Sequence, residues 1–183
     1  ATKLRDEILT ELPDLKLGSA DFMVDIHDKS PSFSGIDDVV FMIKTNPGTP
    51  FAPLHKIASG GELSRLMLAL RVVLNNPNNH KAIIFDELDT GISGATASAV
   101  GQRLDRLSKS EQLLVITHSA QVAGYADKHF KISKQSENDK TTTTVIEITD
   151  DDKINELARI ISGATITPES IATAKILIKK SVL

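Results

Sequence analysis

The feature that most constrains the fold is a regular alternation of helical and extended segments in the middle of the chain. Apolar residues recur at helical spacing in three segments, and a short apolar run lies between each pair of them. In chain order, the helices and strands expected here cover residues 62–74, 81–85, 93–107, 112–117 and 119–126. Short buried strands that alternate with helices are typical of an α/β fold with a largely parallel sheet. We therefore predict an α/β fold in which a largely parallel sheet is flanked by helices and accompanied by a β-hairpin.

Weaker patterns surround this central part. Residues 1–12 predict a short amphipathic helix that stops at Pro13 and has no capping residue at its start. Paired strands are expected at residues 22–26 and 39–43, and a hairpin with a polar tip is expected from residues 130–133 and 141–148. The chain should end with two helices, residues 154–161 and 168–180, the second of which has Pro168 in its first turn.

Composition narrows the class of protein. The chain has 183 residues, of which 40% are hydrophobic, which is ordinary for one globular domain. The absence of cysteine excludes zinc fingers and thiol chemistry. A net charge of -3 provides no overall basic field, so any contact with nucleic acid must be local. No apolar run approaches the roughly 18 residues of a membrane span, and the N-terminus does not read as a signal peptide. We expect a cytoplasmic protein.

The stretch Ser59-Gly60-Gly61-Glu62 lies at the start of a predicted helix. Ser59 and Glu62 fit a capping box, which is a purely structural interpretation. Two glycines in a first helical turn are unfavourable by about 0.5–1 kcal/mol each relative to alanine, and a structural cap does not need them. They indicate that another group comes close to this backbone. The free N–H groups and the positive end of the helix dipole suit a phosphate.

Two adjacent carboxylates, Asp86 and Glu87, follow the apolar strand of residues 81–85. Ligands of open α/β sheets gather beyond the carboxyl ends of the strands. There Asp86 could hold a magnesium ion, mainly through water, and Glu87 could take a proton from an attacking water. The alternative is that both acids only keep a strand end soluble.

Two further motifs follow the same order. Asp89 lies in an acidic, glycine-containing turn, which is unremarkable as a loop. His118 terminates the strand of residues 112–117 and should therefore lie at the same sheet edge as Asp86 and Glu87. A lone histidine at such a place is more often a solvated residue than a phosphate ligand.

The order of these motifs resembles that of ABC-type ATPase heads. The stretch from Ser59 to Glu62 is similar to their signature motif, Asp86-Glu87 to the Walker B strand end, Asp89 to the D-loop and His118 to the switch histidine. Within that superfamily, the longer strings around these motifs resemble the RecN family of bacterial SMC-like proteins for double-strand-break repair. The similarity runs from about Thr45 to Arg159 and continues into the last helix.

The resemblance implies an ATP hydrolase in DNA repair and recombination, whose sites form when two heads of a homodimer meet. It implies that Ser59, Gly60 and Gly61, with Glu62 behind them, bind the γ-phosphate of ATP on the partner head. On the chain's own nucleotide, Asp86 would position Mg²⁺ and Glu87 would activate water. The resemblance also implies that His118 contacts the γ-phosphate and that Asp89 couples the two sites. A bacterial, nucleoid-associated protein is expected.

One element of such a site is missing from the sequence. No glycine is followed by lysine, so the phosphate loop G-x-x-x-x-G-K-[ST] (Walker A) is absent. In RecN-like proteins that loop lies in an N-terminal lobe, beyond a long coiled coil. The resemblance therefore implies that residues 1–12 are the end of the returning coiled-coil helix and residues 13–183 the C-terminal lobe of a head. Alone, this chain should not hydrolyse ATP.

Other functions stay open at this stage. The chain could be a non-catalytic lobe for dimerisation and DNA tethering, the head of another SMC-like or ABC ATPase, or the nucleotide-binding subunit of a membrane transporter. The hairpin and last helices follow the RecN pattern, which disfavours the transporter. Exposed lysines are usually only solvated, but five are candidate contacts to DNA phosphates: Lys128, Lys131, Lys175, Lys179 and Lys180.

Overall fold

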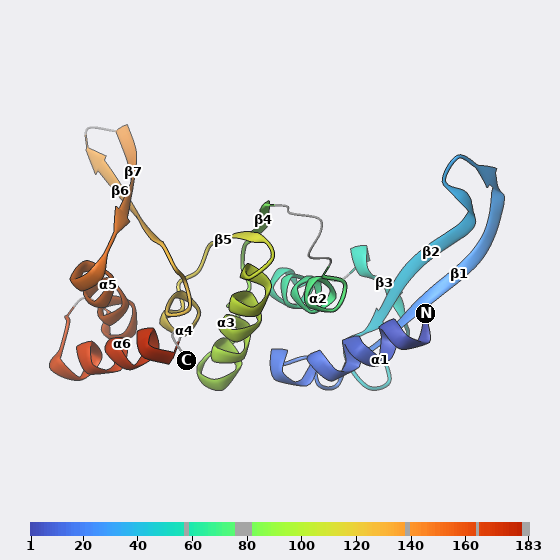
Figure 1. Ribbon diagram of the computed structural model, residues 1–183, viewed down its shortest axis with the longest axis horizontal. Helices are drawn as coiled ribbons and strands as arrows, with labels where there is room; N and C mark the ends of the chain where they lie inside the picture. The colour runs from blue at the N-terminus through green and yellow to red at the C-terminus, as the bar shows by residue number, and fades with distance from the viewer. Residues whose placement is uncertain (57–58, 76–81, 138–139, 164, 181–183) are drawn as a thin grey trace. The chain divides into compact units, whose positions relative to one another are not determined.

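The computed structural model describes residues 1–56, 59–75, 82–137, 140–163 and 165–180. It divides the chain into two compact units, Ala1–Ile116 and Thr117–Leu183. Helices and strands are mixed in both units, so the α/β class expected from the sequence is confirmed (Figure 1). Each unit is described by itself below.

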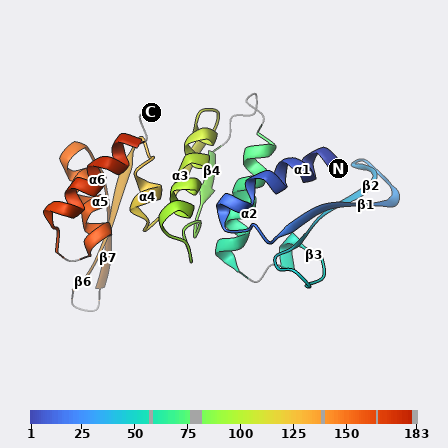
Figure 2. The ribbon, with the colours of Figure 1, turned by 90° about the horizontal axis from the view of Figure 1, so that it is seen from below.

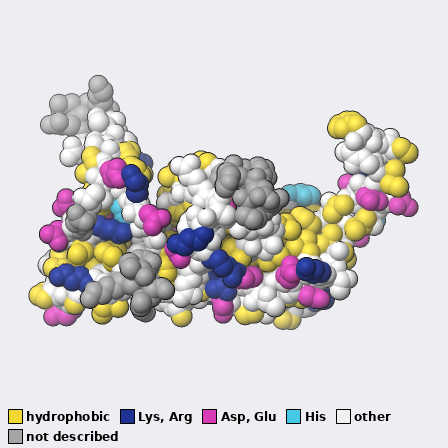
Figure 3. All heavy atoms as spheres, viewed as in Figure 1, with side chains coloured by type: hydrophobic (Ala, Val, Ile, Leu, Met, Phe, Trp, Pro, Cys, Tyr) yellow, Lys and Arg dark blue, Asp and Glu magenta, His cyan; other side chains and the backbone are white. Residues whose placement is uncertain are grey.

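The first unit begins with a helix packed beside an antiparallel sheet. Helix α1, Thr2–Glu11, and the 3₁₀ turn η1, Pro13–Leu15, precede the hairpin of β1, Asp21–Ser32, and β2, Gly35–Lys44 (Figure 2). The short β3, Ala52–Pro53, pairs with β2. Phe22 is opposite Ile43, as the predicted strand pairing requires, and both are buried. Beyond them the hairpin continues to an exposed tip, where Figure 3 shows apolar side chains. Phe33, in the turn between the two strands, is fully exposed.

The rest of the first unit contains the predicted alternation of helices and strands. It runs through η2, Leu54–Lys56, α2, Gly60–Val73, β4, Ala82–Phe85, α3, Gly94–Ser108, and β5, Gln112–Val115. Strands β4 and β5 are parallel, with Phe85 opposite Val115. Parallel pairing is thus confirmed here, whereas the other described strands pair antiparallel. Strand β5 is shorter than predicted, and Lys81, at the predicted start of β4, lies outside the described residues.

The second unit is a hairpin followed by two helices. A single helical turn, α4, Ala120–Ala123, precedes β6, His129–Glu137, and β7, Lys140–Ile148, which pair antiparallel. Residues 138–139 of the predicted tip lie outside the described part. Helices α5, Asp150–Ser162, and α6, Pro168–Lys180, enclose a small core. Its fully buried members are Ala120, Leu157, Ala158 and Ala174.

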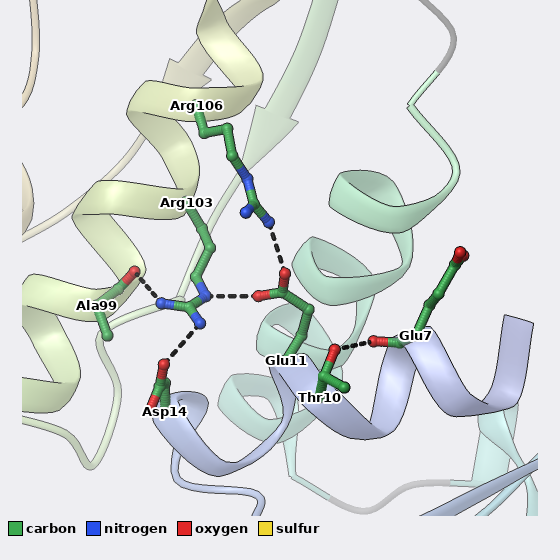
Figure 4. Close-up of polar contacts among 7 residues, drawn as sticks. All are labelled: Glu7, Thr10, Glu11, Asp14, Ala99, Arg103 and Arg106. Atoms are coloured by element: carbon green, nitrogen blue, oxygen red, sulfur yellow. Dashed lines mark hydrogen bonds and ion pairs between the residues drawn. The ribbon is translucent and has the colours of Figure 1, made fainter.

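Charged side chains join α1 and η1 to α3 (Figure 4). The Arg103 guanidinium donates to Glu11 Oε2 and Asp14 Oδ2, both at 2.8 Å, and Arg106 donates to Glu11 Oε1 at 2.6 Å. The side chains of Glu11 and Arg103 are each only 14% exposed, so this cluster is better protected from solvent than an ordinary surface ion pair. It holds the N-terminal helix on the α/β part of the unit.

This cluster predicts a stability change with pH. Burial raises the pKa of Glu11, but hydrogen bonds and charge from Arg106 and Arg103 outweigh it, so the pKa lies below its ordinary value of 4.5. The stabilisation is therefore complete above pH 4.5 and is lost as the pH falls through the folded value. We expect Glu11→Gln to lower the free energy of unfolding by about 1–2 kcal/mol at pH 7 and to reduce its fall below pH 4.5.

Urea unfolding of the chain at several pH values measures this effect. Glu7→Gln is the matched control, because Glu7 is an exposed glutamate of α1 whose contact with Lys3 is 3.8 Å long. If both variants lose stability equally, or if Glu11→Gln keeps the full acid dependence, the assignment to the Glu11 cluster is wrong.

Candidate functional site

The N-terminus of α2 is capped as the sequence predicts. Ser59 has an extended backbone, and its Oγ accepts a hydrogen bond from the Glu62 N–H at 3.4 Å, while Leu63 N–H donates to the Ser59 carbonyl at 3.0 Å. Ser59 and Gly60 are exposed, whereas Gly61 is buried. An exposed first helical turn carries backbone N–H groups that have no partner within the helix, together with the positive end of the dipole. This end of α2 is chemically suited to an anion.

Asp86 and Glu87 follow β4 directly, and both are exposed. Asp86 Oδ1 accepts a hydrogen bond from the Glu87 N–H at 2.9 Å. Glu87 has a φ of 60°, in the left-handed region that non-glycine residues rarely adopt. Such strained conformations persist only where the surrounding structure holds them, and they cluster at functional sites. The turn at Glu87 directs the next residues, Leu88 and Asp89, into the interior.

The side chain of Glu87 lies against the start of α2. A β-carbon placed on Gly60 would overlap the Glu87 carboxylate. The structure thus brings together the glycine pair at the start of α2 and the paired acids after the end of β4. A carboxylate at a helix N-terminus is also favoured by the helix dipole.

The loop of residues 88–91 packs against the second glycine. A β-carbon on Gly61 would lie 3.1 Å from the Thr90 carbonyl oxygen and 3.0 Å from Thr90 Cβ. Within the loop, Thr90 N–H donates to the Glu87 carbonyl at 3.2 Å, and Asp89 is only 3% exposed. The close approach that the glycine pair predicted is therefore made, in this chain, by Glu87 and Thr90.

Arg65 is a residue of this corner for which the sequence analysis predicted no role. Its side chain is buried, and its Nε donates to the Leu15 carbonyl at 3.0 Å while Nη1 donates to the Thr90 carbonyl at 2.9 Å. Lys16, one residue after η1, similarly donates from Nζ to the Gly91 carbonyl at 2.8 Å. The available signal was a positive charge directly before the apolar run of residues 66–70.

Replacing each of the two glycines with alanine should affect stability differently. Gly61→Ala meets the Thr90 backbone, which cannot move without shifting the loop, so we expect the free energy of unfolding to fall by about 1–3 kcal/mol. Gly60→Ala meets only the end of the flexible Glu87 side chain, so stability should be unchanged or slightly higher, since alanine favours a helix by about 0.5–1 kcal/mol over glycine.

Urea unfolding of the two variants, each the control of the other, measures this difference. Equal stability of the two proteins would show that the close approach of Thr90 to Gly61 does not constrain the helix start.

His118 belongs to the second unit and is exposed. It stands just before the cap of α4, where Ser119 Oγ accepts a hydrogen bond from the Val122 N–H at 3.4 Å. The structure thus brings together three of the four predicted motifs, those of Ser59–Glu62, Asp86–Glu87 and Asp89, within the first unit. A role of His118 beside them stays a prediction.

The chemistry of the acids fits a magnesium ion only in part. No group of three or more His, Cys, Asp or Glu side chains that could hold a metal ion occurs among the described residues. Mg²⁺ is commonly held by one or two carboxylates with water and substrate phosphates supplying the other oxygens. Asp86 is suited to be one such ligand, and the others would have to come from nucleotide, water and a phosphate loop.

Two of the candidate DNA contacts are engaged in ion pairs. Lys128 Nζ is 3.1 Å from Glu147 Oε1, and Lys131 Nζ is 2.7 Å from Glu156 Oε2. Lys175 is exposed, and the side chains of Lys179 and Lys180 lie outside the described ones. The Lys131 pair lines a pocket of about 230 Å³ between the hairpin and α5, which contains none of the predicted site residues.

The fold is that of an SMC-type head domain. The chain is similar to the Smc head domain with coiled coil of Pyrococcus yayanosii, with a TM-score of 0.54 and 16% identity, covering 98% of this chain and 29% of that one. It is also similar to a structure from a study of ATP-driven dimerization of SMC ATPases, with a TM-score of 0.50 and 18% identity over 88% of this chain and 93% of that one. At these identities the likeness concerns the fold alone.

The sequence is similar to that of curated relatives named DNA repair protein RecN. The chain is 49% identical over 175 residues to RecN of Rickettsia conorii, covering 96% of this chain and 32% of that protein. It is 40% identical over 177 residues to RecN of Vibrio cholerae, with the same coverage. The predicted resemblance to RecN is thus confirmed, and the chain spans about a third of the length of the curated relatives it matches.

No family model matches the chain. In the described part of the chain, no helix combines the length and apolar character needed to cross a membrane.

Proposed function

We propose that this chain is the C-terminal lobe of an ATPase head in an SMC-like DNA repair protein. ATP binding would join two heads, and hydrolysis would release them. The observation that carries the proposal is the meeting of three motifs in one corner, where Gly60 and Gly61 at the start of α2 contact Glu87 and Thr90. The relatives named RecN support the same assignment.

Two sets of residues have separate roles, one toward the nucleotide of the partner head and one toward the nucleotide of the chain's own head. The start of α2, with exposed Ser59 and Gly60 and buried Gly61, binds the γ-phosphate of ATP held by the partner head, through backbone N–H groups and the helix dipole. Glu62 supports this end of the helix through its N–H bond to Ser59. Because the Glu87 carboxylate now lies at Gly60, it must move aside before a phosphate reaches that position.

The second set acts on the nucleotide of the chain's own head. Mg²⁺ would there neutralise phosphate charge, with Asp86 as one of its ligands. Glu87 accepts the proton of the attacking water, a role worth about 10²–10⁴-fold in rate. His118 contacts the γ-phosphate. Asp89 couples the two sites through the loop that packs on Gly61.

An exposed apolar sheet face supports the presence of a second lobe. Along β4 and β5 every second residue is exposed, and three of these residues are large and apolar: Ile84 at 66%, Leu114 at 53% and, just after β5, Ile116 at 48%. Parallel sheets are normally covered on both faces. We assign this face to the N-terminal lobe of the same protein, which would carry the phosphate loop absent from these residues, and we take residues 1–12 as the end of the coiled coil between the lobes.

ATP turnover by the full-length protein, meaning a protein of RecN length that contains this chain, tests the proposal. We expect hydrolysis that rises when linear duplex DNA is added. A full-length protein that binds no ATP would contradict the proposal, as would one whose heads do not associate when ATP is bound. Enrichment on the bacterial nucleoid after DNA damage is a further expectation, and fluorescence microscopy of the tagged protein checks it.

The isolated chain has a different expected behaviour. Because the sequence contains no phosphate loop, we propose that these residues alone form a dimerisation and DNA-tethering lobe without turnover. Measurable ATP hydrolysis by the purified chain would exclude this second function.

A further inference from the structure

Arg65 makes an unusual set of contacts for a charged side chain. It is 4% exposed, and its guanidinium donates to three backbone carbonyls, those of Leu15 at 3.0 Å, Leu88 at 3.4 Å and Thr90 at 2.9 Å. Its Nη1 also lies 3.1 Å from the position of a β-carbon on Gly61. One side chain thus touches the start of α2, the loop after Glu87 and the turn η1.

These contacts require an arginine. The guanidinium is planar and holds its donors in a fixed fork, so it can satisfy carbonyls from two segments at once, whereas a lysine ammonium is a single point charge. Burial lowers the pKa of Arg65 and the nearby Glu62 carboxylate opposes that shift. The group nevertheless stays charged at neutral pH because its ordinary pKa is far higher. Buried cations are unfavourable unless they are well hydrogen-bonded, and here the bonds go to a loop rather than to an acid.

The loop that Arg65 holds has two residues of the proposed site at its start and centre. Glu87, with its left-handed backbone, immediately precedes Leu88, and Asp89 lies between the Leu88 and Thr90 carbonyls, two of the three that Arg65 binds. Both carbonyls therefore fix the backbone on either side of Asp89, and the first fixes the direction in which the chain leaves Glu87.

We propose that Arg65 is a positioning residue that locks residues 88–90 against Gly61, so that the start of α2 and the loop after Glu87 form one rigid surface. This inference rests on the proposed function, in which α2 serves the partner's nucleotide and Glu87 serves the chain's own. Arg65 is then the group that keeps the start of α2 and Glu87 in a fixed position relative to each other. It makes no contact with nucleotide itself.

The test uses Arg65→Met and Arg65→Lys in the full-length protein. Hydrogen–deuterium exchange of peptides covering residues 86–94 reports the loop, and ATP turnover reports the site. For Arg65→Met we expect faster exchange confined to this segment and a kcat lower by about tenfold, because small misplacements of catalytic groups are costly. The KM for ATP should stay within about twofold, since ordinary nucleotide binding depends on the other lobe. Arg65→Lys should restore folding but not kcat.

Arg103→Met is the matched control. Arg103 is also a poorly exposed arginine of the first unit, but it binds Glu11 and Asp14 instead of residues 88–90. The Arg103→Met protein should be less stable than wild type, but its kcat should be unchanged at temperatures where it is folded. The positioning role would be contradicted if Arg103→Met lost as much kcat as Arg65→Met. It would also be contradicted if hydrogen exchange rose throughout the first unit in Arg65→Met, because Arg65 would then only stabilise the fold.

The failure of the inference and the failure of the proposed function look different. If the wild-type protein hydrolyses ATP and folded Arg65→Met matches its kcat, only the inference is overturned. If the wild-type protein does not hydrolyse ATP, the proposed function is overturned and, with it, the link from Arg65 to catalysis. In that case the exchange of residues 86–94 still decides whether Arg65 holds the loop.

Discussion

Glu87→Gln in the full-length protein should lower ATP turnover by about 10²–10⁴-fold, the usual contribution of a general base. Glutamine keeps the size and polarity of the side chain but cannot accept the proton of the attacking water. ATP binding should persist, because neither Asp86 nor the start of α2 is altered. We therefore expect joined heads that no longer separate, visible as an ATP-dependent dimer in size-exclusion chromatography.

A glutamate outside the site controls for the general effect of removing a charge. Glu7→Gln changes an exposed residue of α1 and should turn over ATP at the wild-type rate. The result that contradicts the assignment is a Glu87→Gln protein that hydrolyses ATP as fast as wild type. In that case another group must activate the water.

Ser59→Arg should have the second largest effect. The substitution places a long cationic side chain at the exposed start of α2, where the proposed phosphate of the partner's nucleotide must approach the backbone N–H groups. We expect head association with ATP to be lost and turnover to fall by about 10²-fold or more, the range for removing groups that stabilise developing charge. Binding of ATP to the protein's own head should remain, as measured by titration with a fluorescent ATP analogue.

Two variants separate blockage from loss of the helix cap. Ser59→Ala removes the Oγ that accepts from Glu62 N–H and should lower the free energy of unfolding by about 0.5–2 kcal/mol, without steric blockage. Thr149→Arg puts the same guanidinium at the start of α5, in the other unit, and should leave turnover unchanged. If Ser59→Arg heads still join and hydrolyse ATP normally, the start of α2 does not face the partner's nucleotide.

Much of the local structure was accessible from sequence patterns. The helical spacing of residues 62–74 predicted α2 to within two residues at its start, and Pro168 marked the first residue of α6. Capping by Ser59 was also predicted correctly. These features depend on a few neighbouring residues, so their physical causes can be read along the chain. The shorter β5 and α4 differ from the prediction because their lengths depend on packing partners rather than on local propensity.

The candidate site was predictable in its members but only partly in its contacts. Glycines at 60 and 61 indicated a close approach, yet the sequence suggested a phosphate, whereas the structure shows Glu87 and Thr90 of the same chain. Arg65 drew no prediction because an arginine beside an apolar run of a helix has no fixed role until its surroundings are known. Its partners are backbone carbonyls. Every residue has one, so the residue types in the sequence do not indicate which carbonyls Arg65 will bind.

The sequence by itself determined the fold class, the order of the motifs and the similarity to RecN, since all three depend on which residues follow one another. Tertiary structure alone decided that Glu87 rests on Gly60, that Asp89 is buried and that Arg65 joins η1 to residues 88–90. These contacts join residues that are more than twenty positions apart. They arise because the start of α2 and the segment after β4 meet where backbone carbonyls need donors, and a buried guanidinium supplies them.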